Sequence, residues 1–498
     1  MGAVIYDGVY VGEDSKIPNL HGIRTALIEK MRAIHAPVIR WPGGCFADSY
    51  DWRDGIGPKD KRPRRTNFWA GSYTHEQQHA KLPQIYDPNA FGTDDFLRFC
   101  ELSGAEAYLA ANLRSLPAME FARWIEYVNS APGSTTLADA RAAAGHPAPY
   151  NVRYWGVGNE SWGCGGNFEA EDYASEFNRF TAWTPTTDTE LRFVASGPNE
   201  SDLDWTHRFF NKIYRGQPGN DSHGIWGWSL HSYAWNLSRG KTKDWVAAKG
   251  DALQFDEMDW YEVLRESDRV EGMVRDHWSV LSQYDLPHHI KLVVDEYGPW
   301  YRPGTEPSAV AAVGQQVTMR DALATALTLD TFNRNAEKVG AAACAQLING
   351  INALFLSHED KFVVTPNFHV FDMYAAHQGA QALRAEFSAP EVRYDRDGKK
   401  ASFWGLRGSA SLKDKTLTLT AVNPDLHAAR ETQILLRGTA KATSAKAIVL
   451  ANPDMHAHNS FDHPDVLVTT SAPVTVRGET LEFTFPPASV VKLEIQLS

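Results

Sequence analysis

Short hydrophobic runs that end in polar residues alternate with amphipathic stretches from residue 38 to about residue 350. The amphipathic stretches, such as 93–104 and 319–336, have the apolar spacing of helices. The hydrophobic runs occupy 38–44, 106–113, 152–160, 192–198, 225–233, 290–298 and 342–349. Nearly continuous apolar strands that alternate with helices are typical of a parallel sheet. At this chain length the pattern predicts a (β/α)₈ barrel rather than an open doubly wound sheet, with one strand unaccounted for.

The pattern changes after about residue 380. Runs such as LTLTAVNP, KAIVLANP and VVKLEIQL follow one another with turn residues every ~8–12 positions, and helical spacing disappears. This texture is typical of an antiparallel β-sandwich. A helix-like segment, 369–385, precedes the change. We therefore expect two domains, a catalytic barrel over residues 1–378 and a β-sandwich over residues 379–498.

Charge and segment composition narrow the class of protein. The net charge of −12 argues against nucleic acid as a partner, because no basic field is present to attract phosphates. No apolar run approaches the ~20 residues that cross a bilayer, and the first residues lack the basic start of a signal peptide. These features predict a cytoplasmic protein without a membrane partner. The four cysteines show no CxxC pair and no metal-ligand spacing, so we expect free thiols and no metal site.

Polar side chains stand at the carboxyl ends of the predicted strands, where barrels of this kind carry their active sites. The strand ends hold Arg40, Asn112, Asn159, Glu160, Ser196, His231, Tyr233, Asp295, Glu296, Gln346 and Asn349. Only two of these strands end in Glu, and the fold would bring Glu160 and Glu296 to one rim. A pair of facing carboxylates is the minimum equipment for cleaving a glycosidic bond.

The two glutamates would divide the work of such a reaction. One holds a proton for the departing oxygen and the other attacks the anomeric carbon; in a retaining enzyme they lie ~5–5.5 Å apart. Neighbouring residues of a strand point to opposite sides. If Glu296 faces the barrel axis, Asp295 should face the helices, which makes Asp295 the weaker candidate for the acid.

Five blocks resemble glycoside hydrolase family 51, the α-L-arabinofuranosidases of clan A. They are IRWPGGCFADSYDWRDGIGPKDKRP (39–63), WGVGNESWGCGG (155–166), SLHSY (229–233), VDEYGPWY (294–301) and AQLIN (345–349). A lone GNE would be a weak signal, whereas five blocks in the family's order are specific. The resemblance covers nearly the whole chain and implies a (β/α)₈ barrel plus a β-sandwich, often assembled into trimers or hexamers.

The resemblance also implies a role for individual residues. Glu160 matches the acid/base, and Glu296 matches the nucleophile that forms a covalent arabinosyl intermediate. Among the substrate-binding residues, Asn159 matches the partner of the sugar 2-hydroxyl, and Gln346 and Asn89 fall where the family contacts the furanose. The residues around the two carboxylates are Tyr233, which steadies the nucleophile, His231 near the acid/base, and Arg40, which favours the ionised nucleophile.

Two features depart from the family pattern. The nucleophile block reads DEYG where DEW is usual, and Tyr fills much of the same space. The family's first barrel strand ends in a Glu-His motif whose Glu binds the sugar, whereas this chain opens at IYDGVYVGEDSKIPN, which matches only the family segment downstream of that motif. The missing eighth strand is thereby explained. We expect that the natural start lies upstream of Met1, because a barrel with an open seam exposes unpaired backbone groups.

These observations predict a retaining, exo-acting α-L-arabinofuranosidase that needs no metal or other cofactor. Its substrate would be an arabinofuranosyl oligosaccharide or a hemicellulose side chain. Two alternatives within the enzyme class are an endo-β-1,4-glucanase and a β-D-galactofuranosidase. An alternative from another class is an inactive sugar-binding or scaffold protein that lacks the first barrel strand. Turnover of an aryl α-L-arabinofuranoside separates these classes.

Overall fold

The computed structural model describes residues 2–69, 86–215, 224–307, 313–438 and 441–498. The chain forms two compact units, each built from several segments. The first comprises Met1–His231, Met273–Glu296 and Lys338–Ala343, and the second comprises Ser232–Gly272, Tyr297–Glu337 and Cys344–Ser498. No helix in the described ranges is long and apolar enough to cross a membrane.

A parallel sheet of seven strands dominates the first unit in the part of the chain that the structure describes. The strands are β3 (Val38–Trp41), β6 (Glu106–Ala111), β7 (Tyr154–Val157), β8 (Arg192–Ala195), β9 (Ile225–Ala234), β10 (Lys291–Pro299) and β11 (Val339–Cys344). Each strand lies beside the next in chain order, so the sheet curls into a nearly closed barrel. The count of seven among the described residues and the positions of the first six strands are confirmed. The last strand, predicted over 342–349, instead begins at Val339 and ends at Cys344.

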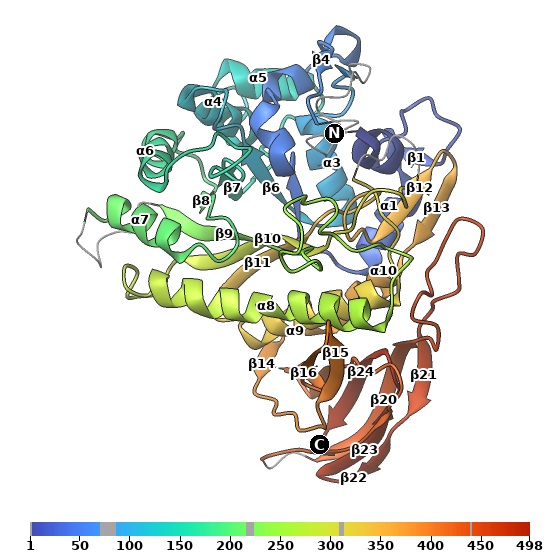
Figure 1. Cartoon of the computed structure of the whole chain (residues 1–498). Coiled ribbons are helices and arrows are strands. Elements are labelled where there is room, and N and C mark those ends of the chain that lie inside the picture. Colours follow the sequence, from blue (N-terminus) through green and yellow to red (C-terminus); the bar gives the residue numbers. More distant parts are fainter. Residues whose placement is uncertain (1, 70–85, 216–223, 308–312, 439–440) are drawn as a thin grey trace. The chain divides into compact units, whose positions relative to one another are not determined.

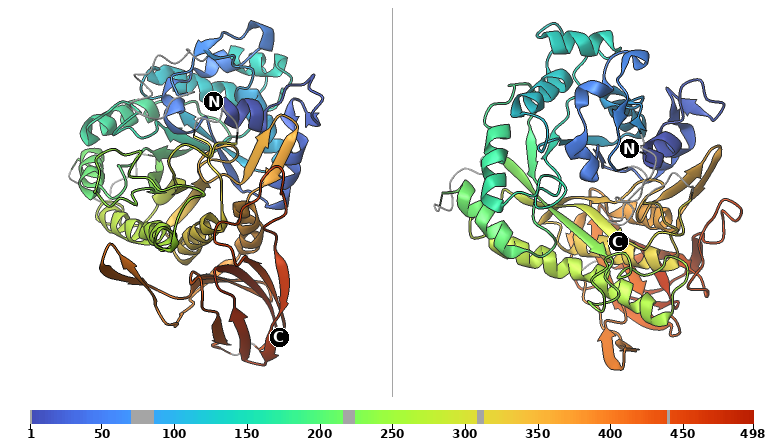
Figure 2. Two further views of the ribbon diagram at one scale, coloured as in Figure 1. Left: turned by 45° about the vertical axis from the view of Figure 1, so that its right-hand side comes forward. Right: turned by 45° about the horizontal axis from the view of Figure 1, so that its top comes forward.

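Helices alternate with these strands. Their bounds are α1 (Thr25–Ala33), α3 (Thr93–Ser103), α4 (Ala118–Asn129), α5 (Thr136–Ala143), α6 (Ala170–Thr181), α7 (Leu203–Ile213), α8 (Glu257–Leu281), α9 (Met319–Arg334) and α10 (Pro366–Tyr374). Figures 1 and 2 show α4, α6 and α7 following one another along the outer side of β6, β7 and β8. The helices predicted over 93–104 and 319–336 are confirmed as α3 and α9.

The interior of the barrel is filled by side chains from alternate strands. Tyr108 of β6, Val194 of β8 and Val293 of β10 pack together there. Gly156 of β7 makes room for them, because a Cβ at this position would lie 3.1 Å from the Tyr108 ring. This layer forms the floor beneath the strand ends.

Antiparallel sheets make up the C-terminal part of the second unit. One has the order β14 (Gln381–Leu383), β17 (Arg407–Lys413), β18 (Thr416–Asn423), β24 (Ser489–Leu497), β20 (Ala442–Ala451) and β21 (Thr470–Pro473), and the other has the order β19 (Arg430–Leu435), β23 (Thr480–Phe485) and β22 (Thr475–Arg477). Leu481 and Phe483 of the second sheet share a core with Leu493 and Ile495 of the first. The predicted antiparallel C-terminal domain is confirmed.

Short strand pairs complete the structure. They are β1 (Asn19–Leu20) with β2 (Ile23–Arg24), β4 (Arg65–Thr66) with β5 (Tyr86–Asp87), β12 (Phe355–His358) with β13 (Lys361–Val364), and β15 (Val392–Arg396) with β16 (Lys399–Phe403).

The helix predicted over 369–385 is wrong in its second half. Helix α10 ends at Tyr374, and a short 3₁₀ turn, Ala375–His377, follows it. Gly379 has a left-handed backbone (φ 65°), and residues 381–383 form β14, which pairs with β17. Tertiary pairing with the neighbouring strand therefore outweighs the helical propensity of this segment.

A buried carboxylate ties α9 to the antiparallel sheet within the second unit. Asp330 of α9 accepts hydrogen bonds from Ser409 Oγ (2.7 Å), Thr420 Oγ1 (2.6 Å) and Tyr374 OH (2.8 Å). Burial raises the pKa of Asp330 to about 6, although the three hydroxyl donors oppose the shift. Strands β17 and β18 are thereby fixed to α9 by polar contacts as well as by apolar packing.

Candidate active site

Four strand ends of the first unit bring ionisable side chains together. Arg40 comes from β3, Glu160 follows β7, His231 lies on β9, and Glu296 lies on β10. The chain turns sharply after β7, because Gly158 and Glu160 both have left-handed backbones, with φ of 86° and 43°. This turn places the Glu160 side chain at the rim rather than along the strand.

The two predicted carboxylates meet. An oxygen of Glu160, an oxygen of Glu296 and a ring nitrogen of His231 all lie within 4.8 Å of one another. The side chains of Glu160 and Glu296 are 20% and 11% exposed, so both remain open to a small molecule. So close an approach is typical of the carboxyl pairs of retaining glycosidases, which lie ~5–5.5 Å apart, rather than of inverting ones, which lie ~6.5–9.5 Å apart.

Arg40 connects the two carboxylate-bearing strands. Its Nη1 donates to Glu296 Oε1 at 2.9 Å, and its Nη2 donates to Asn159 Oδ1 at 2.6 Å. Burial would lower the pKa of Arg40, but the neighbouring Asp295 and Glu296 carboxylates raise it above its ordinary value. The guanidinium is therefore a permanent positive charge that favours an ionised Glu296.

His231 lies between three carboxylates. Its Nδ1 is 2.9 Å from Glu160 Oε1 and 3.5 Å from Glu296 Oε2, and its Nε2 is 3.4 Å from Asp295 Oδ1. Burial would lower the pKa of His231, but the charge of Glu296 and the hydrogen bonds to Asp295 and Glu160 raise it to about 10. The ring is thus an imidazolium that donates from both nitrogens, which restrains Glu160 and Glu296 together.

Asp295 faces the barrel interior, so the prediction that it faces the helices is wrong. Its Oδ2 accepts from Tyr108 OH at 2.9 Å, and its Oδ1 accepts from Ser229 Oγ at 2.6 Å. The prediction assumed that the even-numbered residues of β10, such as Glu296, face the barrel interior. Val293 lies in the interior layer, so the odd-numbered residues, including Asp295, face inward instead. Burial would raise the pKa of Asp295, but Arg40 and His231 hold it well below its usual range.

Two of the four cysteines form a disulfide, so the prediction of four free thiols is wrong. Cys45, in the loop after β3, is bonded to Cys164, in the loop after β7, with a Cα–Cα distance of 5.6 Å. Cys100 and Cys344 are free. The pair was missed because 119 positions separate the two residues, and no local spacing marks such a bond.

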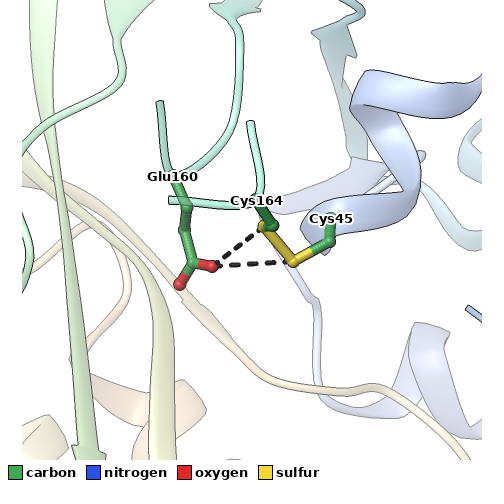
Figure 3. A group of neighbouring side chains, drawn as sticks. All are labelled: Cys45, Glu160 and Cys164. Atoms are coloured by element: carbon green, nitrogen blue, oxygen red, sulfur yellow. Dashed lines mark hydrogen bonds between the residues drawn. A yellow bond between two sulfur atoms is a disulfide. The ribbon is translucent and has the colours of Figure 1, made fainter. Parts of the chain in front are cut away.

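The disulfide forms one wall beside Glu160. Figure 3 shows the Glu160 carboxylate turned toward both sulfur atoms, with Oε2 at 3.3 Å from Cys164 Sγ and 3.7 Å from Cys45 Sγ. A bonded sulfur carries no hydrogen, so these are sulfur–oxygen contacts rather than hydrogen bonds. The acid/base candidate is thus confined between the disulfide on one side and His231 on the other.

The predicted sugar-binding residues have different surroundings. Asn159 is buried beside Arg40. Asn89 has a left-handed backbone (φ 54°), and its Nδ2 donates to the Pro63 carbonyl, so its amide is engaged within its own loop. In the second unit, the Tyr233 ring packs against Trp300 with centroids 5.2 Å apart, and Gln346 Oε1 is buried without a hydrogen-bond partner among the described residues.

Two groups of side chains at the rim have the spacing of metal ligands. Glu160, His231 and Glu296 are close enough to share a cation. Both nitrogens of His231 also face carboxylates, Nδ1 toward Glu160 and Nε2 toward Asp295. In the second cluster, Cys45, Glu160 and Cys164, both sulfurs are committed to the disulfide.

Two glutamates face each other across the carboxyl rim of a barrel of parallel strands. One lies beside Arg40 and the other beside His231. This arrangement defines a glycoside hydrolase. Comparison with known sequences identifies the branch. Residues 30–225 match the family described as "Alpha-L-arabinofuranosidase 1 domain", and residues 295–489 match the "Alpha-L-arabinofuranosidase C-terminal domain". The chain belongs to the α-L-arabinofuranosidases of glycoside hydrolase family 51.

Individual relatives cover the chain from end to end. It is 34% identical to the "Intracellular exo-alpha-L-arabinofuranosidase" of Bacteroides ovatus, over 100% of this chain and 91% of that protein. The GH51 arabinofuranosidase from Xanthomonas axonopodis pv. citri has a similar structure, with a TM-score of 0.90 and 33% identity over 100% of this chain and 94% of that one. The α-L-arabinofuranosidase from Thermotoga maritima, solved as an arabinose complex, gives a TM-score of 0.81 and 26% identity over 100% and 94%.

Proposed function

We propose that the protein is a retaining, exo-acting α-L-arabinofuranosidase that releases terminal arabinofuranose from arabino-oligosaccharides or hemicellulose side chains. The observation that carries the proposal is the approach of Glu160, Glu296 and His231 within 4.8 Å at the strand ends. This close approach favours direct attack by one carboxylate over the wider separation that an inverting mechanism requires. The names of the full-length relatives support the choice of arabinofuranose as the sugar.

In this mechanism Glu296 attacks the anomeric carbon while Glu160 protonates the departing glycosidic oxygen. Glu160 then removes a proton from water, which hydrolyses the arabinosyl-enzyme ester and restores Glu296. Arg40 keeps Glu296 ionised through the 2.9 Å contact, and His231 fixes the direction of the Glu160 carboxyl.

Three further residues would bind the furanose ring, and a fourth would hold the nucleophile in place. Asn159 would bind the 2-hydroxyl, and Tyr233 would steady the nucleophile. Among the described residues Gln346 Oε1 is a buried acceptor without a donor, which suits a sugar hydroxyl. Asn89 is the least supported of the four, because its Nδ2 is used by Pro63.

We also propose the cytoplasm as the location, supported by the name of the Bacteroides ovatus relative, and a homo-oligomer, supported by the family resemblance alone. The division into a barrel of residues 1–378 and a sandwich of residues 379–498 remains our proposal for the domain boundary.

The decisive experiment is hydrolysis of nitrophenyl α-L-arabinofuranoside, with nitrophenyl β-D-galactofuranoside and β-D-glucoside as matched substrates. Proton NMR of the first product formed would show the retained α anomer. Turnover only of glucosides or long glucans would favour an endo-β-1,4-glucanase, and preference for galactofuranoside would favour that specificity. A folded protein that hydrolyses none of them would be a sugar-binding or scaffold protein.

A further inference from the structure

A second carboxylate lies beneath the rim and has no part in the reaction proposed above. Asp48 belongs to the 3₁₀ turn Gly44–Ser49, which follows β3, and it is 0% exposed. Among the described residues no basic side chain forms an ion pair with it. Burial raises the pKa of Asp48 to about 7, opposed by the backbone donors that surround it. A buried carboxylate that lacks an ion-pair partner is costly and therefore requires a structural or functional reason.

Both oxygens of Asp48 accept from backbone amides at the ends of two adjacent strands. Oδ1 accepts from the N–H of Leu113 (2.8 Å) and of Arg114 (3.1 Å), which follow β6. Oδ2 accepts from the N–H of Asn159 (3.0 Å), which follows β7. Of the side chains of this size, only an ionised carboxylate offers acceptors at both positions. The carboxylate thus couples the end of β6 to the residue directly before Glu160.

A matching restraint lies on the other side of Glu160. The N–H of Ser161 donates to Ser196 Oγ at 3.1 Å, and Ser196 follows β8. The peptide groups on both sides of Glu160 are therefore held by side chains from neighbouring strands. Glu160 itself has φ of 43°, a left-handed conformation that costs a non-glycine residue about 1–2 kcal/mol. Such a conformation persists only where the surrounding structure fixes it.

The loop that follows Glu160 is fitted around the same carboxylate. A Cβ at Gly165 would lie 2.8 Å from Asp48 Oδ2 and 1.8 Å from the Asn159 carbonyl oxygen, so this position excludes any side chain. Cys45, three residues before Asp48, is bonded to Cys164 in that loop. The turn after β3 therefore holds the Glu160 segment both by a covalent bond and by the Asp48 hydrogen bond.

We propose that Asp48 and Ser196 are positioning residues for the acid/base, which hold the backbone on either side of Glu160 so that its carboxyl stays aimed at the leaving oxygen. The inference rests on the function proposed above. Neither residue touches the reacting atoms. A displacement of about 1 Å at a catalytic group is enough to reduce a rate by about 10²-fold.

The role can be tested through the leaving group, because a misdirected acid matters only when the departing oxygen needs a proton. In Asp48→Asn one oxygen is replaced by an NH₂ that faces a backbone N–H. We expect kcat/KM for arabinobiose to fall by about 10²-fold, with a less than about 5-fold change for dinitrophenyl arabinofuranoside. Ser196→Ala should likewise lower kcat/KM for arabinobiose more than kcat/KM for dinitrophenyl arabinofuranoside. The parameter kcat/KM reports only the first, proton-requiring step.

Asp94→Asn is the matched control. Asp94 is also a buried carboxylate with a raised pKa, but it accepts from Tyr127 OH (2.7 Å) and Tyr150 OH (3.1 Å), away from the rim. The variant Asp94→Asn should leave the ratio of the kcat/KM values for the two substrates unchanged, even if thermal unfolding shows that it has lost as much stability as Asp48→Asn. Equal losses on both substrates in Asp48→Asn and Ser196→Ala, or no loss in folded variants, would overturn the proposal. If Asp48→Asn does not fold, Ser196→Ala alone decides in the same way.

The test separates this inference from the proposed function. Glu160→Ala must itself show the leaving-group dependence. If Glu160→Ala affects both substrates equally, the acid assignment fails whatever Asp48 does. If Glu160→Ala behaves as expected and the two positioning variants do not, only the positioning role is wrong.

Discussion

The guanidinium of Arg40 lies 2.9 Å from the carboxylate of Glu296, although 256 positions separate the two residues in the chain. The same guanidinium also donates to Asn159 and lies 3.4 Å from Asp295. One side chain on β3 thus contacts groups from two other strand ends, those of β7 and β10. The planar fork of Arg makes this possible, since its two Nη atoms donate to different acceptors while Nε lies in ion-pair range of Asp295.

Arg40→Lys should lower kcat/KM on nitrophenyl arabinofuranoside by about 10²-fold or more, because an ammonium cannot serve the three partners in this geometry. Arg153→Lys is a suitable control, since Arg153 pairs with Glu106 near the start of β6 and is partly exposed. The control should retain nearly full activity. Equal activity of Arg40→Lys and the control would show that the charge alone is sufficient.

Removal of either catalytic glutamate should give a distinct kinetic signature. Glu296→Ala should lose at least about 10⁴-fold in kcat, because no group remains to attack the anomeric carbon. Glu160→Ala should lose about 10²–10⁴-fold on arabino-oligosaccharides and far less on dinitrophenyl arabinofuranoside, and azide should restore turnover of the activated substrate. Glu160→Ala with native activity on arabino-oligosaccharides would contradict the acid assignment.

The raised pKa of His231 predicts a pH dependence of stability. The folded state binds the imidazole proton up to pH about 10, whereas the unfolded chain releases it near 6.5. The stabilisation from His231 is therefore complete below pH 6.5 and is lost as the pH rises toward 10. Between pH 7 and pH 9.5 the free energy of unfolding, measured with urea, should fall less for His231→Gln than for the native protein. An identical decline in both would mean that His231 is neutral in the folded state.

The disulfide can be tested by counting thiols. Alkylation of the unfolded, unreduced protein should modify two cysteines, Cys100 and Cys344, and prior reduction should expose all four. The free energy of unfolding of the double variant Cys45→Ser/Cys164→Ser should be about 2–4 kcal/mol lower than that of the native protein, because the bond closes a long loop. Four modified thiols without reductant would show that the bond does not form.

The barrel was predictable because its strands are buried on both faces and read as continuous apolar runs with polar ends. Glu160 and Glu296 could be paired from sequence for the same reason: carboxyl ends of parallel strands share one rim. Strand β7 illustrates this, since the run 152–160 contains both the strand, Tyr154–Val157, and Glu160, the acid/base candidate that follows it.

Features that depend on contacts between distant loops were not predictable. Asp48 lies within a turn and shows neither a strand-end position nor a periodic pattern, so nothing local marks it. The Cys45–Cys164 bond and the inward direction of Asp295 likewise follow from which residues the barrel brings opposite one another. The segment 381–383 became a strand because β17 offered a partner edge, and local propensity did not reveal that.

The hydrogen bonds of Asp330 have a consequence for how such chains can diversify. Cutting the chain at residue 378 would remove Ser409 and Thr420 and leave a buried carboxylate on α9 with two of its three donors gone. The sandwich is therefore not an interchangeable accessory that recombination could swap for an unrelated module. We therefore expect the sandwich and α9 to be retained together during evolution. A replacement domain joined at residue 378 would need hydroxyl donors in the places of Ser409 and Thr420.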